Sequence, residues 1–222
     1  ASSCPHCGHS IRAWENIPVL SYLLLRGRCS NCKATIGMRY PIVELLTGLL
    51  SLFMVLHFGA TPTAVVALIL VWTLIALTVI DLDEQLLPDQ LTLPLLWLGL
   101  LVNIGGMFTD LTSAVIGAAA GYLSLWFVFQ VFRLLTGREG MGYGDFKLIA
   151  VFGAFLGWQM LPLVVLLSSF IGAIVGVGMI VFLGRDRQIP IPFGPYIAVA
   201  GLVALLWGEQ INRGYLQLAG LG

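Results

Sequence analysis

The chain has 222 residues, of which 59% are hydrophobic and 10% are charged, and its formal net charge is zero. Charged residues make up about one quarter of a soluble domain, so this composition excludes an ordinary soluble globular protein and indicates a polytopic membrane protein. Because the net charge is zero, partners have to be inferred from where the charges lie. We expect the lipid bilayer among them and no nucleic acid.

All four cysteines lie in the first 40 residues, in two pairs with C-x2-C spacing. Cys4 and Cys7 form the first pair, and Cys29 and Cys32 form the second after 21 intervening residues. This spacing is typical of structural zinc sites with four thiolate ligands. Two disulfides are the alternative, which a reducing cytosolic environment disfavours. We predict that residues 1–40 are a small cytoplasmic zinc-binding module, folded with the help of its metal; the neighbouring histidines are left out of the ligand set.

Residues 41–222 are predicted to form the transmembrane domain. Seven apolar stretches approach the roughly 20 residues that a membrane-spanning helix requires. They cover about residues 42–58, 63–80, 91–108, 113–135, 146–161, 162–183 and 194–207. The division between the fifth and sixth stretches, near residues 158–162, is inferred because the uncharged run from Leu148 to Leu183 is too long for one span. The predicted fold class is therefore an all-α polytopic membrane protein with about seven transmembrane helices and a small N-terminal zinc-binding module.

The basic residues indicate the orientation of these helices. If the amino-terminal segment is cytoplasmic, ten of the eleven Lys and Arg residues lie on the cytoplasmic side, and only Arg213 lies outside. This distribution is a strong positive-inside signal. It places Asp81 and Asp145 at the cytoplasmic face, and the odd number of spans places the carboxyl terminus outside.

Small residues recur at the spacing that brings membrane helices together. The three pairs are Gly117 with Gly121, Gly153 with Gly157, and Gly172 with Gly176. We interpret them as helix-contact surfaces and assign them no chemistry.

The first candidate catalytic residue is Asp81, which directly follows the apolar run 71–80 and opens an acidic loop that ends at Asp89. A carboxylate at a membrane boundary is costly and calls for a function. Asp83, Glu84 and Asp89 are expected to be solvated, and Asp89 is also placed to cap the helix that begins near residue 91.

The second candidate is Asp145, which follows Gly140, Gly142 and Gly144 and precedes an apolar helix. It could be a helix N-cap. The three glycines favour a functional interpretation, because they permit another backbone to approach closely and a cap does not need them. If the two carboxyl groups meet, they would share a proton, so that one activates a water molecule while the other donates a proton to a scissile carbonyl.

Two other classes of protein remain as alternatives for these carboxylates. A proton-coupled transporter would use them as a proton relay, but it predicts ionisable groups near the bilayer midplane and often internal repeats. A zinc-bearing membrane assembly factor would use the cysteines to bind a partner and would leave the aspartates without a catalytic role.

Six segments together resemble one known family. They are the two cysteine pairs, Arg39–Glu44, Asp81–Asp89, Gly140–Lys147 and Pro190–Pro195. The chain resembles the prepilin peptidases, also called type IV leader peptidases, which are polytopic aspartyl proteases of bacterial inner membranes with a GxGD signature. Members typically have eight spans, because a further helix precedes the first cysteine pair.

The resemblance implies a substrate, a reaction and a catalytic pair. Asp81 and Asp145 would cleave the leader from type IV prepilins and type II secretion pseudopilins, after a glycine and at the cytoplasmic face. Members with the cysteine pairs are typically bifunctional, which implies that the chain also methylates the new amino terminus with S-adenosylmethionine. The resemblance assigns no residue of this chain to the methyl donor.

Overall fold

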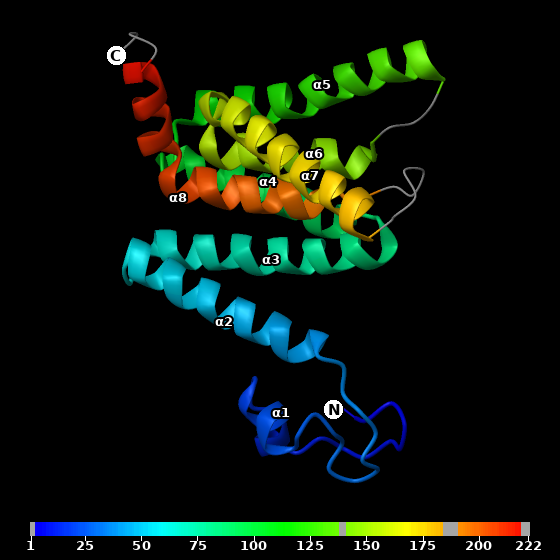
Figure 1. The fold of residues 1–222 in the computed structure, drawn as a ribbon. Helices are drawn as coiled ribbons and strands as arrows, with labels where there is room; N and C mark the ends of the chain where they lie inside the picture. The colour runs from blue at the N-terminus through cyan, green and yellow to red at the C-terminus, as the bar shows by residue number, and fades with distance from the viewer. Residues whose placement is uncertain (1–2, 138–140, 184–190, 219–222) are drawn as a thin grey trace. The chain divides into compact units, whose positions relative to one another are not determined.

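The computed structural model describes residues 3–137, 141–183 and 191–218, and from Arg39 onward these are mostly helical (Figure 1). The α-helices are α1 (Leu20–Leu24), α2 (Arg39–Phe58), α3 (Pro62–Glu84), α4 (Asp89–Val102), α5 (Leu111–Thr136), α6 (Tyr143–Leu156), α7 (Leu161–Leu183) and α8 (Gly194–Leu218). Three short 3-10 helices are η1 (Ala13–Asn16), η2 (Asn103–Gly105) and η3 (Trp158–Met160). Within the described residues there is no β-strand, only two isolated bridges, so the all-α prediction is confirmed.

Each of the seven predicted apolar stretches forms one helix, α2 to α8, and η3 lies at the inferred division between the fifth and sixth stretches. In the part of the chain that the structure describes, five helical segments have the length and hydropathy to cross a membrane: Arg39–Phe58, Pro62–Glu84, Leu111–Thr136, Trp158–Phe182 and Gly194–Leu218. Helices α4 and α6 have 14 residues each, so each rises only about 21 Å. The chain is a multi-pass membrane protein.

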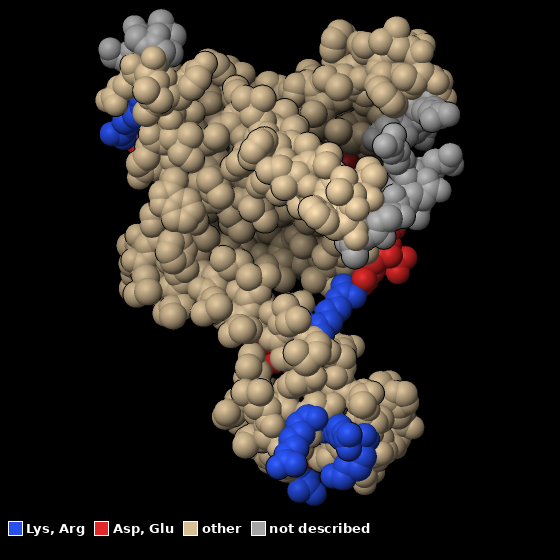
Figure 2. Space-filling model, in the orientation of Figure 1, with Lys and Arg blue, Asp and Glu red and all other residues tan. Residues whose placement is uncertain are grey.

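The chain divides into two compact units, Ala1–Ile75 and Ala76–Gly222. In the first unit, the cysteine-bearing segment is tied to α2 by the backbone N–H of Val19, which donates to Glu44 Oε2 at 2.8 Å. A turn at Gly59, with φ of +69°, joins α2 to α3. The indole of Trp72 then donates to Ser51 Oγ at 2.9 Å, which links α3 to α2. Figure 2 shows blue basic side chains gathered on the cysteine-bearing part, whereas the helices are almost entirely tan in this view.

In the second unit, α6 is the central helix and contacts α4, α5, α7 and α8 (Figure 1). A Cβ atom on either Gly117 of α5 or Gly153 of α6 would collide with the carbonyl oxygen of the other glycine. Gly99 of α4 lies against the ring of Phe155, and Gly201 of α8 lies against the ring of Phe152. Glycines on three surrounding helices therefore allow α6 to be packed closely, as the small-residue spacing on α5 and α6 predicted.

The carboxyl end of α6 is held by Asn103, a buried residue at the end of α4. Its side-chain nitrogen donates to the carbonyl oxygens of Ala154 and Phe155 at 2.8 and 2.9 Å, and its side-chain oxygen accepts from the N–H groups of Phe108 and Thr109. The last carbonyls of a helix lack partners within the helix, so this one amide satisfies two of them and fixes the depth of α6 in the bundle.

Candidate active site and metal centre

Asp81 lies within α3, three residues before the helix ends at Glu84. The apolar run stops at Ile80, but the helical hydrogen bonds continue, since the N–H of Gln85 donates to the carbonyl of Asp81 at 3.0 Å. The Asp81 side chain is 4% exposed. Its Oδ2 accepts a 2.9 Å hydrogen bond from the N–H of Gly194, the first residue of α8, whose N–H has no partner inside its own helix.

Asp145 is the third residue of α6, and Gly142 occupies the N-cap position. The Asp145 side chain is 7% exposed, and its Oδ2 accepts a 3.3 Å hydrogen bond from the N–H of Gly142. This is the returning half of a capping box, in which the third residue bonds back to the cap amide. Asp145 therefore contributes to the helix start from inside α6, and the N-cap position expected as the alternative is taken by Gly142.

Leu87 connects the surroundings of the two aspartates. A Cβ atom on Gly144 would lie 2.7 Å from Leu87 Cβ, and one on Gly194 would lie 3.1 Å from Leu87 Cδ2 and 2.7 Å from Asp81 Oδ2. Leu87 is itself 5% exposed. The carboxyl groups of Asp81 and Asp145 are close enough to interact electrostatically, so residues 64 positions apart come together beside this leucine.

The glycines before Asp145 were expected to allow another backbone to approach closely, and the structure shows a different arrangement. The close neighbour of Gly144 is the side chain of Leu87, and a Cβ atom on Gly142 would meet only atoms of its own turn, at 3.7 Å or more. Gly140 lies outside the described residues.

An ion pair joins the segments that carry the two aspartates. Lys147 Nζ of α6 lies 2.5 Å from Oδ1 of Asp89, the first residue of α4. Asp89 was expected to be solvated or to cap α4. The N-cap is instead Pro88, and Asp89, although exposed, is paired with a residue two positions after Asp145. Asp83 and Glu84 are exposed, as expected.

Sequence reasoning missed Leu87 and Gly194 as parts of this site. Gly194 belongs to the proline-rich segment Pro190–Pro195, which the family resemblance includes but for which the sequence suggests no role. Lys147 is visible in the sequence as a basic residue close to Asp145, but its pairing with Asp89 is not.

The four cysteine sulfurs form a candidate metal site, with all Sγ atoms within 4.8 Å of one another. The cysteines are free thiols, and Sγ of Cys4 and Sγ of Cys32 are 3.9 Å apart, close to the separation of about 3.8 Å that a tetrahedral zinc ion with Zn–S bonds of about 2.3 Å requires. The disulfide alternative is therefore not seen. Cys4 and Cys29 are buried, whereas Cys7 and Cys32 are exposed.

The two cysteine pairs adopt the same turn. The N–H of Gly8 donates to the carbonyl of Cys4, and the N–H of Lys33 donates to the carbonyl of Cys29; Gly8 and Lys33 have φ of +67° and +60°. Backbone N–H groups within such turns point at sulfur. Those of Cys32 and Asn31 lower the pKa of Cys29 to about 6, and that of His9 lowers the pKa of Cys7, whereas burial and the neighbouring thiols raise the pKa of Cys32 to about 11. Stabilised thiolates are the form that binds metals.

The nearby histidines lie outside the metal-site group, as the sequence analysis expected. His9 Nε2 lies 3.6 Å from Glu15 Oε2 instead, and His6 is exposed.

Comparison with known proteins identifies relatives along the whole chain. Residues 68–177 match the model of the type IV leader peptidase family, and residues 1–58 match the bacterial peptidase A24 N-terminal domain. A protein of Pseudomonas aeruginosa named prepilin leader peptidase/N-methyltransferase is 61% identical over 219 residues, which cover 99% of this chain and 76% of that protein. Proteins with the same name from Aeromonas hydrophila and Legionella pneumophila are 60% and 49% identical over 97% of this chain, and 74% and 75% of their own lengths are covered. No solved structure matches.

Proposed function

Since the chain belongs to the type IV leader peptidase family, we propose that it is a membrane aspartyl endopeptidase in which Asp81 and Asp145 are the catalytic pair. The observation that supports this assignment is the meeting of two buried carboxyl groups, from α3 and α6, beside Leu87. Family membership also removes the basis for the transporter and assembly-factor alternatives.

The hydrogen bonds of Asp81 and Asp145 suggest which carboxyl oxygen of each residue takes part in proton transfer. Backbone N–H groups of Gly194 and Gly142 occupy Oδ2 of Asp81 and Oδ2 of Asp145, so we assign the chemistry to the two Oδ1 atoms. Two carboxyl groups that interact electrostatically do not both ionise readily, and we propose that this pair shares a proton. The ionised group takes a proton from the attacking water, and the protonated group donates one to the carbonyl oxygen of the scissile bond.

The proposed substrates are type IV prepilins and type II secretion pseudopilins, cleaved after a glycine. A prepilin has a short basic leader followed by an apolar helix in the bilayer, so its scissile bond lies at the cytoplasmic interface. The distribution of Lys and Arg supports the same side for Asp81 and Asp145, in the inner membrane of a bacterium with the carboxyl terminus outside. Exposed Asp83 and Glu84, at the end of α3, would attract the basic leader.

Two further components complete the proposal. The four thiolates would hold a structural Zn²⁺ ion that stabilises the fold of the cytoplasmic module. S-adenosylmethionine would supply a methyl group to the new amino terminus, usually a phenylalanine. The neutral amine nitrogen forms the new N–C bond while the S–CH₃ bond breaks with its electrons left on sulfur, and the resulting ammonium releases a proton to water.

Conservative removal of each carboxyl charge tests the catalytic pair. Asp81→Asn and Asp145→Asn should each lower the rate of prepilin cleavage by about 10²–10⁴-fold, because each removes a group that transfers a proton. Asp110→Asn is the matched control: Asp110 caps α5 by accepting from the N–H of Ser113, and asparagine caps helices equally well. Cleavage is read as the size of the prepilin after incubation with each purified variant in lipid. Full processing by either of the first two variants would disprove the pair.

A further inference from the structure

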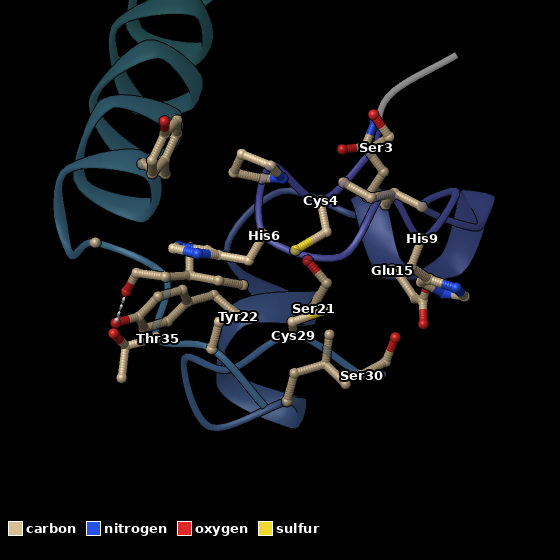
Figure 3. A pocket seen from close by; sticks show the side chains of 18 of the residues that line it. Ser3, Cys4, His6, His9, Glu15, Ser21, Tyr22, Cys29, Ser30 and Thr35 are labelled. Carbon is tan, nitrogen blue, oxygen red and sulfur yellow. Dashed lines mark hydrogen bonds and ion pairs between the residues drawn. The ribbon is translucent and has the colours of Figure 1, made fainter. Parts of the chain in front are cut away.

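Helix α1 has one apolar face that is open and another that packs inside the cysteine-bearing part. Leu20, Leu23 and Leu24 recur at the spacing of a single helix face and are 50%, 66% and 68% exposed. Tyr22 lies on the opposite face and lines the cavity drawn in Figure 3. Its hydroxyl donates to the carbonyl of Ile36 at 3.3 Å, which ties α1 to the rest of the part. The helix therefore presents three leucines outward on a fixed support.

The contact between this part and α2 places the leucines at the level of the membrane surface. Val19, which precedes α1, donates its backbone N–H to Glu44 Oε2 at 2.8 Å. Glu44 follows the start of the span Arg39–Phe58 by five residues, which is about 7.5 Å along the helix axis. The headgroup layer on each side of the hydrocarbon core is roughly 5–7 Å thick. With Arg39 and the exposed ring of Tyr40 among the headgroups, α1 begins near the boundary with the acyl chains.

The exposed charges around α1 are basic. Among the described residues before Arg39, the exposed Lys and Arg side chains are those of Arg12, Arg26, Arg28 and Lys33. Figure 2 shows the basic side chains gathered on this part of the chain. Glu15 is the single acid among residues 1–38, and its side chain is 5% exposed and lies beside His9 (Figure 3). Exposed leucines next to exposed arginines match a bilayer surface that carries anionic lipids.

We propose that α1 is an interfacial helix that lies in the surface of the membrane crossed by α2, with Leu20, Leu23 and Leu24 among the first acyl-chain carbons and the two arginines that follow α1, Arg26 and Arg28, on anionic phosphate headgroups. The basic leader of the proposed substrate does not fit this surface, because the arginines repel it. The bilayer does fit, and the link to α2 holds it close to α1 at all times, so that weak contacts suffice.

Photocrosslinking of the full chain tests where the apolar face lies. Leu24 is replaced by the photoreactive residue p-benzoylphenylalanine, and the protein is illuminated in nanodiscs of phosphatidylcholine and phosphatidylglycerol. Covalent lipid adducts are expected in the mass spectrum of the intact protein. The same replacement at Ser10 is the control, since Ser10 is exposed and pairs with Ser3, which Figure 3 shows apart from Ser21 of α1. It should give far fewer adducts.

Two outcomes of this experiment would overturn the proposal. A crosslink from position 24 to protein, either within the same chain or in a second copy, would show that the leucines form a protein contact. A yield of lipid adducts at position 24 no higher than that at position 10 would show that α1 lies away from the bilayer. Neither measurement depends on peptide cleavage or methyl transfer, so the proposed function stands or fails separately.

Hydrogen exchange tests the anionic component of the proposal. In the unmodified protein, the amides of residues 20–28 should exchange about tenfold more slowly in nanodiscs with about one third phosphatidylglycerol than in nanodiscs of phosphatidylcholine alone. The double variant Arg26→Gln with Arg28→Gln should lose this difference. Arg213→Gln, a charge loss in an exposed ion pair of α8, is the control and should keep it. Equal exchange of the unmodified protein in the two lipids would overturn the assignment of anionic headgroups to this surface.

Discussion

At the scale of single residues, the hydrogen bond from Gly194 to Asp81 requires a residue without a side chain. A Cβ atom at position 194 would lie 2.7 Å from Asp81 Oδ2 and 3.1 Å from Leu87 Cδ2. The carboxyl group would have to move, and Leu87 with it. Gly194 is therefore a positioning residue for both halves of the proposed catalytic pair.

Gly194→Ala is expected to reduce prepilin cleavage at least tenfold, because small displacements of catalytic groups are costly. Gly214→Ala, in the same helix and with no heavy atom within 4 Å of its added Cβ, should cleave as the unmodified protein does. Cleavage rates of both variants, with zinc content as a check of folding, decide the point. Equal rates for the two variants would show that the Asp81 contact is dispensable.

The ion pair between Lys147 and Asp89 should have a smaller effect. Their side chains are 25% and 52% exposed, and exposed pairs contribute about 0.2–1 kcal/mol. Lys147→Met and Asp89→Asn should each slow cleavage about two- to fivefold, and the double variant should be no slower than either single one.

Exchange of the two charges, Lys147→Asp with Asp89→Lys, should restore part of the cleavage rate if the pair positions the segments. Strictly additive losses, with no recovery in the exchanged variant, would contradict such a role.

The candidate aspartates could be predicted from the sequence, whereas their partners could not. A carboxylate beside an apolar run is visible locally, which is how Asp81 and Asp145 were selected. The bond from Gly194 joins residues 113 positions apart, and the contact between Leu87 and Gly144 depends on how helices pack. Neither is recorded in composition or periodicity.

At the scale of helices, α5 and α6 contact each other directly through their backbones. A Cβ on Gly153 would meet the carbonyl of Gly117, and a carbonyl within a helix cannot move aside as a flexible side chain can. Replacing a helical glycine by alanine ordinarily gains about 0.5–1 kcal/mol, but overpacking a core costs about 1–3 kcal/mol. The net effect of alanine here should be destabilising.

Gly153→Ala is therefore expected to lower the unfolding temperature of the detergent-solubilised protein by several degrees. Gly178→Ala in α7, whose added Cβ meets no heavy atom within 4 Å, should leave it unchanged or raise it. An unfolding temperature for Gly153→Ala at or above that of the unmodified protein would show that α5 and α6 separate without cost.

The positions of the helices were predicted better than their ends. An apolar stretch in the sequence ends at the first charged or polar residue, but the hydrogen bonds of the helix continue beyond it. Helix α3 includes Asp81, Asp83 and Glu84, and α8 ends at Leu218 rather than at the predicted residue, about 207. Helix ends are set by which backbone groups find partners, and the apolar length of a segment does not determine this.

At the scale of the whole molecule, the cysteine-bearing part should depend on metal while the helical unit should not. Of the described residues before Pro41, only Cys4, Cys29 and one glycine are buried, so metal binding would supply folding free energy. The purified protein should contain about one zinc ion per chain, and Cys29→Ser should lose it.

His6→Ala is the control for this measurement and should keep its metal, because His6 lies outside the sulfur group. Metal content by mass spectrometry and limited proteolysis before and after chelation check the prediction: cuts should appear before residue 41 and not in α3 to α8. A zinc-free protein that resists proteolysis in this part would contradict it.

The burial of α6 has a consequence for how freely its sequence can vary. From Asp145 to Phe155 every residue except Lys147 is buried, whereas α2 buries only Pro41 and Met54. Lipid accepts any apolar side chain, but a packed interior accepts only the right shape. In a saturation mutagenesis screen, exchanges among Leu, Ile, Val and Phe should be neutral along most of α2 and harmful along α6. Although α6 is one of the shorter apolar helices, its sequence should therefore tolerate fewer substitutions than that of α2.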